Sequence, residues 1–369
     1  MKHIRAGLAI GTALTAMIAL SSCAANESSA GSSGSSGSSS ASTSNLQGTL
    51  NGAGSSAQGN SQTQWAKDFQ TQHSGVTVNY SPVGSGAGRT AFEQGGAAFA
   101  GSDSYMSDAE AKGSFAMCAD GTKGIDLPDY ISPIAFAFNL KGVKSLNLDS
   151  TVLAKIFTGK ITTWNDPAIA ALNKGESLPA TNIDPIHRSD KSGTTHNVSD
   201  YLNKTAGSVW TNPADDSFPY KTGEGAQGTS GMVAAVKGGN GTIAYIDNSQ
   251  AGGLSVAKIK VGSDWVAPSA DGAAKAAEAG SVVPGRDAND IAIQVDRTTT
   301  DSSQYPVTLI SNLIVCKQYK DPSVGSLVKA YAQYVTSADG QAASAKVAGS
   351  APMSSALIDK VQKVVATIK

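Results

Sequence analysis

Residues 188–195, "RSDKSGTT", place an arginine, a lysine, an acid, four hydroxyl groups and a glycine within eight positions. An arginine side chain binds tetrahedral oxyanions through paired hydrogen bonds, and the free N–H groups at a helix start add neutral donors. The residues that follow have the pattern of a helix. The segment therefore predicts one side of an oxyanion site, while an activated serine and a plain helix cap remain alternatives.

Three other stretches of small residues could contribute to the same site: "GAGSSA" (52–57), "GSGAG" (84–88) and "GSD" (101–103). Most of these stretches precede a probable helix, whose first turn offers unpaired N–H groups and the positive end of the helix dipole. One such stretch is usually a simple cap. Several in one chain, together with an arginine, indicate a dehydrated oxyanion held by many neutral donors.

Asp103 is the acidic member of these stretches. A carboxylate beside a bound anion is repulsive unless it accepts a proton from that anion. Phosphate carries a proton at neutral pH and sulfate does not, so Asp103 predicts a pocket that selects phosphate over sulfate. The alternative is an aspartate that only stabilises a turn.

Motifs of common enzymes and metal sites are absent from the sequence. It has no G-x-S-x-G, H-E-x-x-H or G-x-x-x-x-G-K-[ST], and His187 and His196 lack a cysteine or acid at metal-ligand spacing. We expect no catalysis, metal or cofactor, with a secreted phosphatase or serine hydrolase using Ser192 or Ser85 as an alternative. The glycine-rich segment 223–231 predicts one more helix start, which we expect to be structural.

Composition and periodicity favour an α/β protein of two lobes. The chain has 369 residues, only 15% of them charged, and a formal net charge of −1, which is no footprint of nucleic-acid binding. Strand and helix patterns alternate. Two long apolar strands, near 131–140 and 305–316, could each cross between lobes. We therefore expect a discontinuous first lobe, 45–135 with 300–369, and a second lobe, 136–299.

The N-terminus has the pattern of an export signal. Lys2 and Arg5 precede an apolar run over residues 6–20 and then "LSSC", which ends at Cys23. This resembles a bacterial lipoprotein signal and implies cleavage after residue 22 and a lipid, diacylglycerol with palmitate, on Cys23. An ordinary secretory signal is the alternative. Residues 23–44 are rich in Ser and Gly and are expected to form a flexible tether.

Two cysteines remain after Cys23, namely Cys118 and Cys316. Cysteines of exported chains usually pair, so we predict a disulfide between them. Two buried free thiols are the alternative.

The motifs above resemble one family. Together with "TGKITTWND" (158–166), "GTIAYID" (241–247) and a late "DGQ…APM", they are similar to the substrate-binding protein of the bacterial high-affinity phosphate ABC transporter, the PstS family. The resemblance covers residues 50–358. It implies a two-lobed type II periplasmic-binding-protein fold, or Venus flytrap, that closes on inorganic phosphate. A monomer of this kind passes phosphate to permease subunits driven by a cytoplasmic ATPase.

Carried over by position, the resemblance implies a set of phosphate contacts: Ser56, Ala57, Ser85, Asp103, Arg188, Ser192, Gly193 and Thr194. Asp190 would hold the guanidinium group of Arg188. The family often has Thr-Phe where this chain has Ser56-Ala57, so Ser55 stays open as an alternative to Ser56.

Other functions remain open at this stage. A binding protein for sulfate, molybdate or another oxyanion would use the same donors, and an adhesin or sensor could use the same fold without transport. The expected location is outside the cytoplasmic membrane, held there by the lipid on Cys23.

Overall fold

The computed structural model describes residues 46–369. The predicted signal peptide (1–22), the lipid on Cys23 and the tether (23–44) lie outside the described residues. No helix in the described range combines the length and apolar character needed to cross a membrane.

The central feature is a nine-stranded sheet with the order β2-β1-β3-β14-β4-β8-β6-β7, and with β9 paired to β4. Its strands are β1 (Gly48–Gly54), β2 (Val76–Ser81), β3 (Phe99–Ser102), β4 (Gly124–Asn139), β6 (Asp184–Arg188), β7 (Glu224–Ala226), β8 (Thr242–Asp247), β9 (Ser255–Val256) and β14 (Thr308–Cys316). Two small sheets consist of β5 (Asn147–Leu148), β10 (Lys258–Val261) and β11 (Asp264–Val266), and of β12 (Ser281–Val282) and β13 (Ile293–Gln294).

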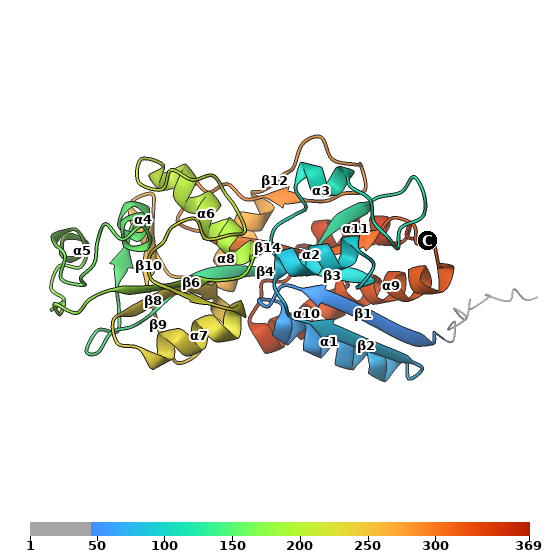
Figure 1. Ribbon diagram of the computed structural model, residues 1–369, viewed down its shortest axis with the longest axis horizontal. Helices are drawn as coiled ribbons and strands as arrows, with labels where there is room; N and C mark the ends of the chain where they lie inside the picture. Colours follow the sequence, from blue (N-terminus) through green and yellow to red (C-terminus); the bar gives the residue numbers. More distant parts are fainter. Residues whose placement is uncertain (1–45) are drawn as a thin grey trace, which may run out of the picture. The chain divides into compact units, whose positions relative to one another are not determined.

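Strand β4 joins the two lobes (Figure 1). Residues 124–133 pair antiparallel with β14, and residues 134–139 pair antiparallel with β8. Both β4 and β14 are buried along almost their whole length, as their continuous apolar runs predict for strands covered on two faces. The first lobe contains strands from both ends of the chain, since β14 lies between β3 and β4.

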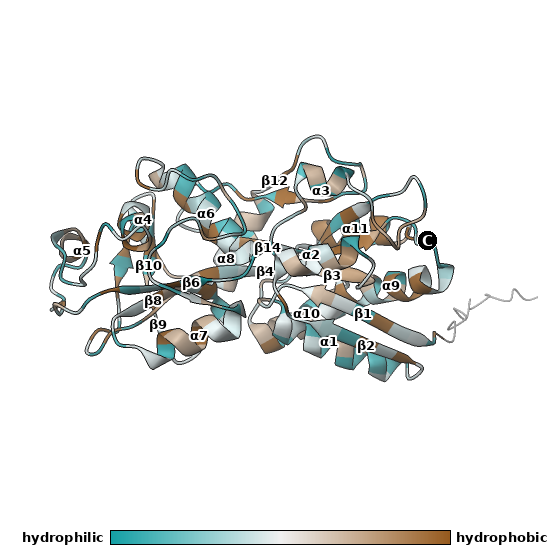
Figure 2. Ribbon diagram, in the orientation of Figure 1, coloured by the Kyte–Doolittle hydropathy of each residue, from teal (hydrophilic) through white to brown (hydrophobic). Residues whose placement is uncertain are grey.

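Helices cover the sheets on both faces. They are α1 (Gly59–Gln72), α2 (Ser85–Glu93), α3 (Asp108–Lys112), α4 (Ser150–Phe157), α5 (Pro167–Leu172), α6 (Gly193–Ala206), α7 (Gly228–Gly238), α8 (Ala270–Glu278), α9 (Pro322–Val335), α10 (Ala338–Ala348) and α11 (Ser355–Val365). Helix α1 buries Trp65 and Phe69, and Figure 2 shows hydrophilic residues along its outer side. This is the amphipathic pattern of a helix that packs on a sheet.

The "TGKITTWND" segment forms a turn between two capped helices. Asp149 begins α4 by accepting a hydrogen bond from the Val152 N–H group at 2.8 Å, and Asp166 does the same for Ala168 in α5. Pro167 occupies the first position of α5, where a missing N–H group costs nothing. The indole N–H of Trp164 donates to the Gly241 carbonyl at 3.0 Å and ties this turn to the start of β8.

The predicted disulfide is confirmed. Cys118 and Cys316 are bonded, and they join the loop after α3 to the last residue of β14. The bond links positions 198 residues apart within the first lobe.

Candidate functional site

The candidate site lies where the main parallel strands of the two lobes end. Strands β1 and β3 are parallel and finish together, with Gly54 opposite Gly101. Each is followed by a segment that the sequence singled out, and β6 is followed by residues 189–192 and helix α6. Open α/β sheets bind ligands at this edge because helix starts and loops converge there.

Five predicted side chains are buried here: Ser85, Asp103, Arg188, Ser192 and Thr194. The backbone N–H group of Asp103 donates to Ser85 Oγ at 3.2 Å, and Thr194 Oγ1 donates to Asp103 Oδ2 at 3.1 Å across the lobes. The lobes are therefore in contact around Asp103.

Asp103 lies among neutral donors in a dry environment. Ser311 Oγ donates to its Oδ1 at 2.7 Å, and Thr194 donates to its other oxygen. Burial raises the pKa of Asp103, and hydrogen bonds from Ser55, Ser311 and Thr194 and the charge of Arg188 oppose that rise. The oxygens of Asp103 are therefore held by hydroxyl groups rather than by a direct ion pair.

Arg188 supplies the positive charge of the site, and Asp190 fixes its orientation. Arg188 Nε donates to Asp190 Oδ1 at 2.7 Å, and Nη2 pairs with Oδ2. The Gly228 N–H group also donates to Asp190 at 3.1 Å. Burial alone would raise the pKa of Asp190, but the bonds and charge of Arg188 lower it. Within residues 46–369, Nη1 of Arg188 makes no hydrogen bond, so its two N–H groups remain for a ligand.

Helix α6 begins against the first lobe. Ser192 is its N-cap and accepts a hydrogen bond from the Thr195 N–H group at 3.5 Å. A Cβ atom on Gly193 would come within 2.5 Å of the Ser104 nitrogen and 2.6 Å of the Asp103 carbonyl carbon. Only glycine therefore allows this close approach of the two backbones.

The loop after β1 separates the roles of its two serines. Ser55 is fully buried, accepts a hydrogen bond from the Ala57 N–H group at 3.1 Å and also contacts the carboxyl group of Asp103. Ser56 Oγ instead accepts a hydrogen bond from the Thr229 N–H group, at 3.0 Å, at the start of α7. The structure thus places Ser55, the alternative to Ser56, beside Asp103. The N–H group of Ala57 already donates a hydrogen bond within the loop, to Ser55 Oγ.

The start of α7 was expected to be structural only. It contacts two predicted site residues, because Thr229 bonds to Ser56 and Gly228 bonds to Asp190. This helix start therefore packs against two predicted site residues, and its expected structural role stays a prediction.

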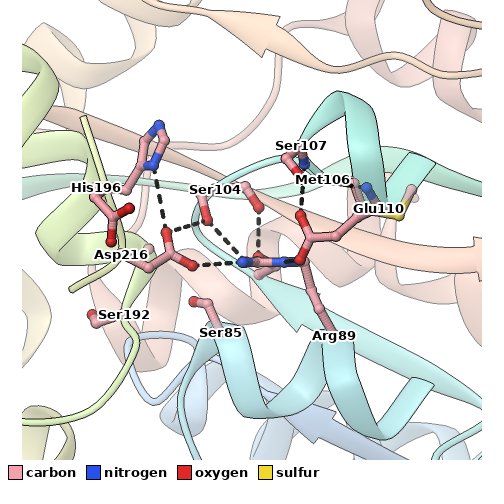
Figure 3. Close-up of polar contacts among 12 residues, drawn as sticks. Ser85, Arg89, Ser104, Met106, Ser107, Glu110, Ser192, His196 and Asp216 are labelled. Carbon is pink, nitrogen blue, oxygen red and sulfur yellow. Dashed lines mark hydrogen bonds and ion pairs between the residues drawn. The ribbon is translucent and has the colours of Figure 1, made fainter. Parts of the chain in front are cut away.

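An ion-pair cluster at the mouth of the site was not anticipated from the sequence (Figure 3). Arg89 of α2 pairs with Asp216 of the second lobe at 2.5 Å and with Glu110 of α3 at 2.8 Å. Ser104 Oγ donates to Asp216 at 3.0 Å and accepts a hydrogen bond from Arg89 at 3.0 Å. The only sequence signal was that Arg89 follows "GSGAG", since its partner lies 127 residues away.

The second lobe also contributes His196 to this cluster. His196 Nδ1 lies 3.4 Å from Asp216 Oδ1. Burial alone would raise the pKa of Asp216, but hydrogen bonding to His196 and the charge of Arg89 hold it well below its ordinary value. Asp216 is therefore ionised, and it connects Arg89 of the first lobe with His196 of the second.

The other histidine near the site is satisfied without a metal. His187 Nδ1 lies 3.0 Å from the Arg188 carbonyl oxygen, and its ring stacks on Phe218 with centroids 4.0 Å apart. No group of three His, Cys, Asp or Glu side chains suited to a metal ion occurs in the range 46–369.

Comparison with known proteins places this site in a family. Residues 39–339 match the PBP superfamily domain. Phosphate-binding protein PstS 3 of Mycobacterium tuberculosis is 40% identical over 291 residues, which are 77% of this chain and 78% of the relative. The chain belongs to the PstS family. Phosphate-binding protein PstS of Xylella fastidiosa, a more distant relative, is 31% identical over 74% of this chain and 73% of its own.

Solved structures share the fold at lower identity. A phosphate-binding protein from Stenotrophomonas maltophilia has a TM-score of 0.67 and 19% identity, covering 86% of this chain and 93% of its own. A putative phosphate ABC transporter substrate-binding protein with bound phosphate, from Clostridium perfringens, has a TM-score of 0.59 and 17% identity, covering 83% and 100%. The type II two-lobed periplasmic-binding-protein fold, with a discontinuous first lobe, is thereby confirmed.

Proposed function

We propose that this PstS-family protein binds inorganic phosphate outside the cytoplasmic membrane and delivers it to the permease subunits and cytoplasmic ATPase of an ABC importer. The observation that carries the proposal is a buried carboxyl group, Asp103, set among hydroxyl donors within reach of the charge of Arg188. A proton acceptor beside a cation suits an oxyanion that still carries a proton. The names of the relatives, phosphate-binding proteins, support the same ligand.

In the proposed complex, Arg188 pairs with the phosphate charge and Asp103 accepts the ligand's proton. Ser85, Ser192 and Thr194 donate from their hydroxyl groups, Gly193 donates its N–H group, and the loop after β1 contributes through Ser56 and Ala57, or through Ser55. Closure of the lobes excludes water, which strengthens each of these interactions.

The attachment and transport partners are part of the same proposal. A lipid on Cys23 and a tether over 23–44 would keep a monomer at the membrane surface. We also propose that one lobe consists of residues 45–135 and 300–369, and that the other consists of residues 136–299. The ion pair between Arg89 and Asp216 supports a closed form in which phosphate is held for delivery.

We also propose that the protein is not an enzyme. Incubation with a chromogenic phosphate ester tests this directly, because a phosphatase or hydrolase using Ser192 or Ser85 would release the dye. Sustained release by the purified protein that is abolished in Ser192→Ala or in Ser85→Ala would contradict a pure binding role.

Deletion of the gene tests delivery. High-affinity phosphate uptake should fall, and an intact copy should restore it whereas Arg188→Ala should not. Tight phosphate binding in vitro with no uptake defect on deletion would instead favour a sensor or adhesin.

A further inference from the structure

Strand β4 contains a β-bulge at Asp129. Tyr130 pairs with Ser311 and Pro128 pairs with Asn312, so Asp129 has no partner on β14. A bulge breaks the regular alternation of a strand and redirects a side chain, and bulges are frequent beside functional sites. Asp129 is completely buried. The bulge therefore aims a buried carboxyl group near the site rather than at the solvent.

A late sequence motif braces the bulge. Gln341, the last residue of "DGQ", donates through Nε2 to the Asp129 carbonyl at 2.7 Å. Its own Oε1 accepts a hydrogen bond from the N–H group of Met353, the last residue of "APM", at 3.2 Å. Neither motif is among the predicted phosphate contacts, and both help to fix the position of Asp129.

A hydrogen-bonded path leads from Asp129 to Asp103. Gln58 Nε2 donates to Asp129 Oδ1 at 3.1 Å and also to Ser311 Oγ. Ser311 Oγ donates to Asp103 Oδ1 at 2.7 Å. The Gln58 amide cannot turn over freely, because its Oε1 accepts a hydrogen bond from Gln62 Nε2 at 2.8 Å.

Counting donors shows what this path does to Asp103. Ser311 has one hydroxyl hydrogen, and because Gln58 donates to its oxygen, that hydrogen is left for Asp103 Oδ1. If the amide of Gln58 were reversed, its oxygen would take the Ser311 hydrogen away from Asp103. Asp129 opposes that reversal together with Gln62, because it accepts a hydrogen bond from the Gln58 amide nitrogen.

The two carboxyl groups differ in their surroundings. Asp103 has three hydroxyl partners and lies within the influence of Arg188, whereas Asp129 Oδ2 has no hydrogen-bond partner among the described residues. Burial, and then the charge of Asp103, raise the pKa of Asp129 well above its ordinary value. Of two buried acids that cannot both ionise at low cost, Asp103 is the one that takes the charge.

We propose that Asp129 is a positioning residue for phosphate selection: through Gln58 and Ser311 it fixes the Asp103 carboxylate by a hydrogen bond to Oδ1, while Oδ2, which also accepts from Thr194, keeps a second acceptor site for the ligand's proton. The inference rests on the proposed function. It adds Asp129, Gln58 and Ser311 to the determinants of phosphate over sulfate, although none of them needs to touch the ligand.

The test compares phosphate and sulfate dissociation constants of the purified protein at neutral pH, by competition titration, in Asp129→Leu, Asp129→Asn and Ser311→Ala. Asp129→Leu removes the acceptor for Gln58, so the preference for phosphate should fall about tenfold, the value of one hydrogen bond. Asp129→Asn keeps an acceptor oxygen and should stay within about twofold of the wild type. The double variant Asp129→Leu/Ser311→Ala should lose no more than either single variant, because both act on one path.

Leu153→Ala, in the buried core of α4, controls for loss of stability alone and should leave the preference unchanged. Asp129→Leu with wild-type preference would overturn the inference. If Asp129→Leu does not fold, Ser311→Ala provides the test. An unchanged preference for phosphate over sulfate in Ser311→Ala would equally exclude the hydrogen-bonded path. A wild-type protein that binds no phosphate would overturn the proposed function itself. If the wild type and the variants all prefer phosphate over sulfate to the same degree, only the role of Asp129 is overturned.

Discussion

Asp103 carries the choice of ligand at the scale of single residues. A carboxyl group with hydroxyl donors at both of its oxygens and no direct cation partner can accept a proton from phosphate but only repels sulfate. Arg188 supplies attraction without that choice, because a guanidinium group binds either anion. The site thus separates affinity, from Arg188, and selectivity, from Asp103.

Asp103→Asn should weaken discrimination against sulfate, because an amide can donate to a fully deprotonated anion. Lowering the pH should have the same effect in the wild type. Since the pKa of Asp103 is raised, its proton is taken up at a higher pH than for an ordinary aspartate, and sulfate binding should appear as the pH falls. Competition binding with phosphate and sulfate over a pH series checks both. Selectivity that is unchanged in Asp103→Asn at every pH would remove Asp103 from this role.

Arg188→Ala should weaken phosphate binding by roughly 2–5 kcal/mol, the range for truncating one partner of a buried charge pair, since Asp190 is left without its cation. Arg188→Lys keeps the charge but not the paired hydrogen bonds with Asp190, so an intermediate loss is expected. Calorimetry on both variants measures the losses. A loss under about 0.5 kcal/mol for Arg188→Ala would place Arg188 outside the site.

At the scale of elements, the helix starts of both lobes meet and the ion pair of Arg89 holds them together. Helix α2 presents Arg89, and the loop after α6 presents Asp216, with Glu110 and His196 as further partners. This contact forms between lobes, so it favours the closed form over the open one.

Asp216→Asn should populate the open form and reduce phosphate affinity about ten- to a hundredfold, because buried Arg89 loses one of its two acid partners and closure loses an attraction. Small-angle scattering without and with phosphate, beside calorimetry, measures both effects. Lys204→Gln is the control, since its partly exposed pair with Asp200 lies within the second lobe and does not cross between lobes. Equal affinity and equal scattering in Asp216→Asn and wild type would show that the pair does not affect closure.

Most elements could be predicted because their patterns are local. Asp149 and Asp166 mark helix starts, and the apolar runs of β4 and β14 mark buried strands. The pairing of Arg89 with Asp216 could not be predicted, since the two residues are 127 positions apart and neither segment has a pattern that specifies its partner. The same holds for Asp129, whose role depends on a bulge that only strand register reveals.

The candidate site, too, could be predicted from the sequence only in part. The residue types around Arg188 and Asp103 suggest an oxyanion without any structure, because charge and proton chemistry are properties of side chains. Which of Ser55 and Ser56 faces Asp103 depends on the turn after β1, and two adjacent serines carry no local signal that separates them.

At the scale of the whole molecule, several buried acids make stability depend on pH. Asp247, at the end of β8, is fully buried and accepts hydrogen bonds from the Tyr130 hydroxyl at 3.2 Å and the Ser249 N–H group at 2.9 Å. Burial raises its pKa from 3.8 to about 6, in spite of the opposing bonds from Ser249. The unfolded chain loses this proton near pH 3.8, whereas the folded protein keeps it to about pH 6.

The folded state therefore binds more protons in that window, and stability falls as the pH rises from about 3.8 to about 6 and is flat above it. Asp247→Asn should remove this decline and raise the free energy of unfolding by about 1–3 kcal/mol at pH 8, with little effect at pH 3. Urea unfolding of both proteins across this range provides the measurement. Parallel curves for variant and wild type would contradict the assignment.

The main proposal is that the site binds phosphate and rejects sulfate. Titration calorimetry of the protein, stripped of bound ligand, with phosphate and then with sulfate at neutral pH tests it most directly. We expect tight one-to-one binding of phosphate to the protein and no heat of binding with sulfate. Equal or stronger binding of sulfate would contradict Asp103 as the proton acceptor, and no heat with either anion would contradict the oxyanion site altogether.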